Sequence, residues 1–112
     1  MTIFNIHSAR QAPADAQPFL AGAQKKFGFV PNLLGGLAEA PATLEAYLAL
    51  GSILDKASFN PVERQVVLLA TSVENNCTYC VAAHSLIAKH MVKADAAVVD
   101  ALRAQEQIAD SK

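Results

Sequence analysis

The sequence predicts an all-α fold, a compact bundle of about five to six helices. Alanine and leucine dominate, and aromatic residues make up only 6% of the chain. Good helix formers fill the long segments, and no clear alternation of apolar and polar residues appears after the first six positions. The apolar fraction is 53%, and a chain of this size buries only about two-thirds of its unfolded surface. We therefore expect packing between identical subunits to complete the bundle.

The first half of the chain contains three expected helical segments. The segment 13–27 predicts a helix that is weakened or kinked near Pro18. A GFVPN loop follows, and its proline opens a short segment, 32–40, which contains two adjacent glycines. Another proline opens the next helix, 41–56, whose apolar residues recur at steps of three and four on one face.

The second half predicts three further helices. Asn60 is a good cap, Pro61 a good first residue, and Glu63 takes the third helical position, which approximates a capping box. This helix is apolar on most sides through VVLLATSV and should be central. Asn75 or Asn76 can cap the next helix, which should run from about Cys77 to about Met91. A last helix is expected within 93–105.

Composition and charge exclude several classes of function. The length of 112 residues favours a single domain, 1–112. The net charge is −1 without a run of one sign, so we expect no nucleic acid and no anionic membrane partner. No stretch reaches the roughly 20 apolar residues of a spanning helix, and the N-terminus lacks the pattern of a secretory signal. The expected location is therefore cytoplasmic.

The segment ENNCTYCVAAH, residues 74–84, holds the two cysteines of the chain. On a helix, Cys77, Cys80, His84, Ile87 and Met91 form one stripe, because they follow one another at steps of three and four. Both sulfurs and the imidazole should therefore face the same way. The CxxC motif should lie at the N-terminal turn of a core helix.

Four interpretations of this stripe compete. The three side chains could be ordinary core residues, since cysteine is often buried, but this leaves the spacing unexplained. Zinc would need a fourth ligand, and neither His7 nor His90 has useful spacing. A structural disulfide in so short a loop would remove little unfolded-state entropy. A redox-active dithiol accounts for the most features, because the first helical turn favours the thiolate and His84 can exchange a proton with Cys80.

The segment ERQVVLLATSVENNCTYCVAAHS closely resembles the core motif of the alkylhydroperoxidase D-like and carboxymuconolactone decarboxylase superfamily. The stretch KKFGFVPNLLGGLAEAPATLEAYLALGSIL is similar to its peroxidase-related branch, and the resemblance spans roughly residues 19–103. It implies an all-α fold, obligate trimers or hexamers, and peroxide reduction by a cysteine pair. By matching positions it makes Cys80 the thiol that attacks peroxide, Cys77 the resolving thiol and His84 part of the proton relay. The helix dipole alone would favour Cys77 as the attacking thiol.

The sequence departs from the family pattern at three places. Tyr79 replaces the histidine that some members carry just before the second cysteine. Gln65 stands where the best-known relay has a glutamate, and an amide cannot carry a proton in that way. Glu74 and Glu63 are the two carboxylates that could substitute, and we prefer Glu74, because Glu63 already has a role as a capping-box partner. The chain also stops where members usually continue with another helix, so it is either a short member or a truncated product.

The expected activity is therefore a thiol-dependent peroxidase with an antioxidant role. It needs a hydroperoxide and a dithiol reductant, such as a lipoyl-carrying or thioredoxin-like protein, and no haem, flavin or metal cofactor. Two alternatives stay open. One is a decarboxylase that acts on a lactone, and the other is a non-enzymatic helical oligomer whose thiols sense oxidants or only pack.

Overall fold

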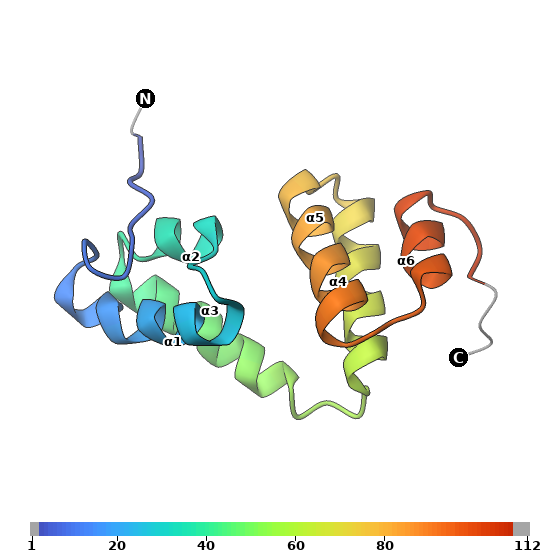
Figure 1. Ribbon diagram of the computed structural model, residues 1–112, viewed down its shortest axis with the longest axis horizontal. Helices are drawn as coiled ribbons and strands as arrows, with labels where there is room; N and C mark the ends of the chain where they lie inside the picture. Colours follow the sequence, from blue (N-terminus) through green and yellow to red (C-terminus); the bar gives the residue numbers. More distant parts are fainter. Residues whose placement is uncertain (1–2, 109–112) are drawn as a thin grey trace. The chain divides into compact units, whose positions relative to one another are not determined.

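The computed structural model describes residues 3–108, and these contain six α-helices and no strand. The all-α prediction is thus confirmed (Figure 1). The chain divides into two compact units, Met1–Ala57 and Ser58–Lys112, and each is described by itself. The cysteine pair and His84 belong to the second unit.

The first unit contains α1 (Gln17–Phe27), α2 (Asn32–Leu37) and α3 (Pro41–Leu54). A short 3₁₀ turn at Ala14–Ala16 precedes α1, so the helix expected over 13–27 starts later than the sequence predicted. Pro18 lies in the first turn of α1 and not inside it. It causes no kink there, because a first-turn residue needs no intrahelical N–H bond.

The N-terminal segment is held against α2 by its backbone. The N–H of His7 donates to the Gly35 carbonyl at 3.1 Å, and His7 Nε2 lies 2.5 Å from Glu39 Oε2. A Cβ on Gly35 would lie 2.8 Å from the His7 carbonyl oxygen, so only glycine permits this approach. The core beneath is apolar and is formed by Ala12, Ala16, Leu20, Ala23, Leu34, Ala38 and Leu44.

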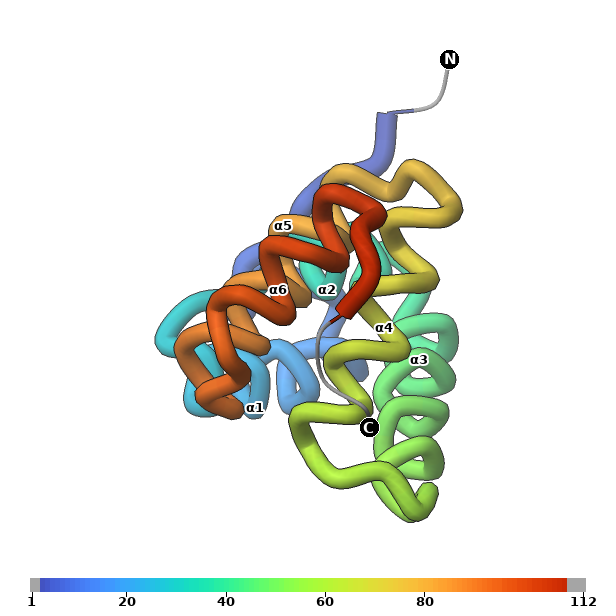
Figure 2. The backbone as a smooth tube through the Cα atoms, turned by 90° about the vertical axis from the view of Figure 1, so that its right-hand side faces the viewer, coloured from blue at the N-terminus to red at the C-terminus, as the bar shows by residue number. Residues whose placement is uncertain are grey.

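The second unit contains α4 (Pro61–Glu74), α5 (Thr78–Leu86) and α6 (Ala96–Arg103). Figures 1 and 2 show α4 and α5 as an antiparallel pair with α6 beside it. The core between these helices is formed by Leu69, Ala88 and Val99, with Val73, Val81, Ala94 and Leu102 packed around it.

The start of α4 has the predicted capping box. The Asn60 side chain accepts the Glu63 N–H at 2.9 Å, and the Glu63 carboxylate accepts the Asn60 N–H at 2.9 Å. Two of the helix's unpaired N–H groups are satisfied in this way. The capping box therefore fixes the first turn of α4. Gln65 follows directly after this turn.

The helix that begins at Thr78 changes type before it ends. Its last turn, Ile87–Met91, is a π-helix, in which the Val92 N–H donates to the Ile87 carbonyl at 3.0 Å. A π turn holds one more residue than an α turn, so it rotates the positions that follow. The helix does reach Met91, as expected, but the α-helical stripe from Cys77 is regular only as far as Ile87.

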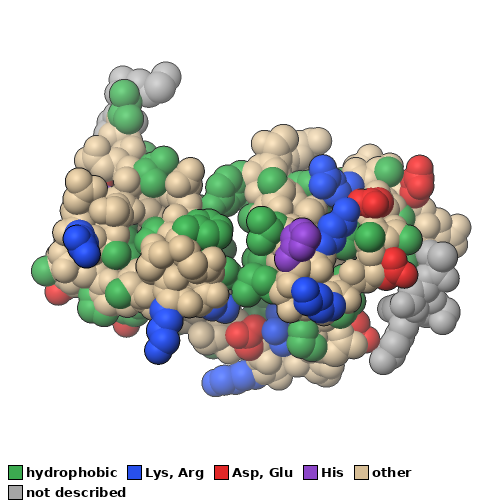
Figure 3. All heavy atoms as spheres, in the orientation of Figure 1, with side chains coloured by type: hydrophobic (Ala, Val, Ile, Leu, Met, Phe, Trp, Pro, Cys, Tyr) green, Lys and Arg blue, Asp and Glu red, His purple; other side chains and the backbone are tan. Residues whose placement is uncertain are grey.

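Large apolar side chains remain exposed on the surface of both units (Figure 3). On α3 they include Tyr47, Leu50, Ile53 and Leu54, and in the second unit Val67, Leu86 and Met91. Packing between subunits stays a prediction, because the structure contains a single chain. No helix among residues 3–108 combines the length and the apolar character needed to span a membrane.

Candidate active site

The cysteine pair is positioned by the tight connection between α4 and α5. The Cys77 N–H donates to the Ser72 carbonyl at 2.9 Å, which ties the connection back to the last turns of α4. Asn76, immediately before it, has a left-handed backbone with φ of 54°. Asparagine tolerates this conformation better than most residues. Cys77 thereby becomes the N-cap of α5, and the helix proper begins at Thr78.

Cys77 and Cys80 are joined by a disulfide, with their Cα atoms 5.3 Å apart. Both residues are half-buried. The Cys80 N–H donates to Cys77 Sγ at 3.3 Å, so this sulfur accepts a bond from the third N–H of the helix. A negative charge on Cys77 would be stabilised at this position by the N–H and by the helix dipole. The two sulfurs are thus close enough to form a disulfide at the start of α5.

His84 lies on α5 one turn beyond Cys80, on the same face. Its imidazole is half-buried, and burial lowers the pKa of His84 below its ordinary value of 6.5. The side chain is therefore neutral at pH 7. A neutral imidazole can accept a proton, which is the property that a base for a neighbouring thiol needs.

Gln65 is the side chain that holds the imidazole. It projects from α4 and is only 9% exposed, and its Oε1 lies 3.0 Å from His84 Nδ1. Nineteen residues separate the two, so the contact depends on the pairing of α4 with α5. Sequence reasoning noted this position only as a missing glutamate, and it did not identify the contact.

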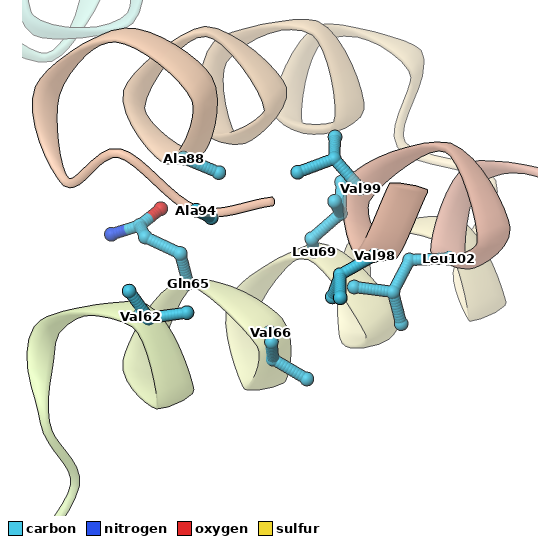
Figure 4. Close-up of a pocket in the computed structure, with 9 residues that line it drawn as sticks. All are labelled: Val62, Gln65, Val66, Leu69, Ala88, Ala94, Val98, Val99 and Leu102. Carbon is cyan, nitrogen blue, oxygen red and sulfur yellow. The ribbon is translucent and has the colours of Figure 1, made fainter. Parts of the chain in front are cut away.

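Gln65 also borders an apolar crevice of about 180 Å³, a volume that includes space open to solvent. Figure 4 shows Gln65 at one edge of it, on the side of Ala88 and Ala94. The other lining residues are Val62, Val66, Leu69, Val98, Val99 and Leu102. The crevice is too narrow to admit a water molecule, so it serves as packing around the Gln65 side chain.

The two glutamates considered as relay residues lie elsewhere on α4. The Glu63 carboxylate accepts a bond from the Asn60 backbone in the capping box. Glu74 is exposed at the last position of α4, nine residues and hence about 13.5 Å along the helix axis from Gln65. The structure thus brings Cys77, Cys80 and His84 onto one helix and adds Gln65. A relay role for Glu74 or Glu63 stays a prediction.

The sequence pattern of the carboxymuconolactone decarboxylase family matches residues 41–111, well over half of the chain. The chain belongs to the carboxymuconolactone decarboxylase family. Its match begins at the first residue of α3 and contains the whole CxxC segment with His84. A search of curated proteins finds no match to the chain.

Membership of the carboxymuconolactone decarboxylase family confirms the resemblance seen in the sequence. The family includes alkylhydroperoxidase D-like peroxidases as well as decarboxylases. The site of this member contains a cysteine pair. No group of three or more histidine, cysteine or acidic side chains that could hold a metal ion is found within residues 3–108.

Proposed function

We propose that this member of the family is a thiol-dependent peroxidase that reduces hydroperoxides through a Cys77/Cys80 dithiol–disulfide cycle. The observation that supports it best is the disulfide-bonded pair at the start of α5, followed one turn later by a neutral, half-buried imidazole. A decarboxylase has no need of a cysteine pair. Two sulfurs within bonding distance supply the two electrons that reduction of one peroxide bond requires.

In the proposed cycle Cys80 attacks first. Its thiol passes a proton to His84, and the thiolate attacks the distal oxygen of the hydroperoxide and breaks the O–O bond. The product is a sulfenic acid on Cys80, and the departing alkoxide takes the proton from His84 and leaves as an alcohol. The sum of this step is one thiol and one hydroperoxide converted to one sulfenic acid and one alcohol.

Cys77 then closes the disulfide. Its thiol displaces water from the Cys80 sulfenic acid, and the bond between the two sulfurs forms. A dithiol reductant restores both thiols by exchange and becomes a disulfide itself. A dihydrolipoyl group or a thioredoxin-like protein has the required chemistry. The working form is proposed to be a homo-oligomer, a trimer or hexamer, in which neighbouring subunits cover exposed apolar side chains such as Leu50 and Ile53.

The order of the two cysteines can be tested with serine variants. Serine is itself a good N-cap, so Cys77→Ser keeps a cap on α5 while it removes one sulfur. With peroxide, Cys77→Ser should accumulate a sulfenic acid on Cys80 that reacts with dimedone, and Cys80→Ser should form none. Dimedone labelling of Cys77 in the Cys80→Ser variant, with none in Cys77→Ser, would reverse the order and favour the helix-dipole assignment.

Turnover separates an enzyme from a sensor. Peroxide-treated protein should lose about 2 Da as the disulfide forms, and repeated peroxide consumption should follow when a dithiol is supplied. The double variant Cys77→Ser/Cys80→Ser should consume none. Thr78→Ser, an exposed position between the cysteines, serves as the matched control. Peroxide consumption that survives in the double variant would refute the dithiol mechanism, and disulfide formation without turnover would indicate a sensor.

A further inference from the structure

We infer that Gln65 is a positioning residue that holds His84 in the tautomer with its proton on Nδ1 and leaves Nε2 to receive the proton of Cys80. This inference rests on the proposed function, because it names the atom of His84 that acts there. It assigns a task to a residue at which this chain departs from the family's glutamate.

The assignment follows from the chemistry of the contact. Oε1 of Gln65 is a carbonyl oxygen and can only accept a hydrogen bond. At 3.0 Å from His84 Nδ1 it therefore requires a proton on that nitrogen. The bond one ring nitrogen makes decides which tautomer a neutral histidine adopts. Nε2 is then unprotonated and carries the lone pair.

Burial keeps the Gln65 amide and the His84 imidazole bonded to each other. Gln65 is only 9% exposed, and the residues around its side chain are apolar. An unpaired amide oxygen or imidazole N–H in such surroundings would cost the free energy of its lost hydration, so each group keeps the other as its partner. The bond at Nδ1 thereby restrains the ring and leaves Nε2 as the nitrogen available to Cys80, which lies one turn earlier on the same face of α5.

Glutamine also limits the route of the proton. Its amide does not titrate near neutral pH, so it neither takes a proton from Nδ1 nor supplies a negative charge to the imidazolium. Burial lowers the pKa of His84, and its partner at Nδ1 is an amide rather than a carboxylate. A proton that arrives on Nε2 is accordingly held weakly, and it is passed directly to the alkoxide released by the peroxide. Cys80, His84 and the departing oxygen complete the transfer without a carboxylate relay.

The tautomer can be measured without any peroxide present. In the reduced wild-type protein labelled with ¹⁵N-histidine, the His84 spectrum at neutral pH should show a protonated Nδ1 and an unprotonated Nε2. Gln65→Met keeps the length of the side chain and removes the acceptor, so the population should shift toward protonated Nε2. Gln65→Glu keeps an acceptor oxygen and should retain the Nδ1–H form. Gln107→Met changes an exposed glutamine of the same unit and should leave the spectrum unchanged.

The rate of reaction supplies a second measurement. Gln65→Met should slow the reaction of Cys80 with peroxide by roughly tenfold or more, and Gln65→Glu should restore part of the rate. A wild-type spectrum with the proton on Nε2 would overturn the inference, because the amide would then face His84 through its NH₂ group. So would an unchanged peroxide rate in a Gln65→Met protein that has lost the Nδ1–H tautomer. If the spectrum is as expected but the wild-type protein does not reduce peroxide, the proposed function fails and the assignment of the tautomer stands.

Discussion

Replacing Asn60 by alanine should destabilise the protein through the first turn of α4. The side chain of Asn60 accepts the Glu63 N–H at 2.9 Å, and alanine leaves that N–H without a protein partner. Loss of a capping side chain costs about 1 kcal/mol, with a range of about 0.5–2. A change of this size lowers the melting temperature of a domain of about 100 residues by roughly 4–8 °C. Asn60→Asp keeps an acceptor and is the matched control.

The same capping box allows the structural role of Glu63 to be separated from a catalytic one. Glu63→Gln retains an oxygen that can accept the Asn60 N–H, and it removes the negative charge at the helix N-terminus. That charge contributes about 0.3–1 kcal/mol. Glu63→Ala also loses the hydrogen bond, so its cost should be greater, on the order of 1–2 kcal/mol. Neither variant should slow the peroxide reaction of the folded protein if Glu63 is only a capping residue.

The assay combines urea denaturation, followed by far-UV circular dichroism, with the initial rate of peroxide consumption. The expected order of stability is wild type, then Glu63→Gln, then Glu63→Ala, at equal peroxide rates below the unfolding transition. An Asn60→Ala protein as stable as the wild type would refute the capping argument. A Glu63→Gln protein that is stable but inactive would make Glu63 a relay residue.

Four further predictions follow from individual contacts. Burial lowers the pKa of His84, so protonation of this side chain favours the unfolded chain. The free energy of unfolding should therefore be highest above about pH 6.5 and should decrease as the pH falls below that value. His84→Gln should flatten this part of the curve of stability against pH. Glu74→Gln should leave the peroxide rate unchanged if His84 passes its proton directly, and a large loss of rate would restore the carboxylate relay. Ser85 is 4% exposed and its hydroxyl has no hydrogen-bond partner among residues 3–108, so Ser85→Ala should raise the free energy of unfolding by about 1 kcal/mol in denaturation experiments. Gly36→Ala should stabilise α2 by about 0.5–1 kcal/mol, because no described atom lies within 4 Å of the new Cβ. Gly35→Ala should give no such gain, because its Cβ would meet the His7 backbone, and hydrogen exchange of that variant should show a freed His7 amide.

Local signals in the sequence were sufficient to locate most helices of the second unit. The Asn60–Pro61–Glu63 pattern predicted the start of α4 and its capping box, because every partner lies within four residues. The start of α1 was placed too early, since Pro18 was taken as an interior proline and is a first-turn residue. Pro18 has helix-forming residues on both sides, so propensity alone does not show whether this proline lies in the first turn of a helix or in its interior.

The site was only partly predictable for a related reason. The spacing of Cys77, Cys80 and His84 along one helix could be read from the sequence, since it depends only on helical geometry. The bond between His84 and Gln65 could not, because it depends on the rotation of α4 against α5. The π turn at Ile87–Met91 was also unforeseen, since no residue type marks it.

The sulfur of Cys77 has a consequence for how the redox state can be observed. One atom closes the disulfide with Cys80 and accepts the N–H at the start of α5. We expect the reduced Cys77 sulfur to keep accepting this N–H, so that α5 begins at the same residue in either redox state. The far-UV spectrum should accordingly report almost nothing about oxidation, and thiol counting or mass has to report it instead.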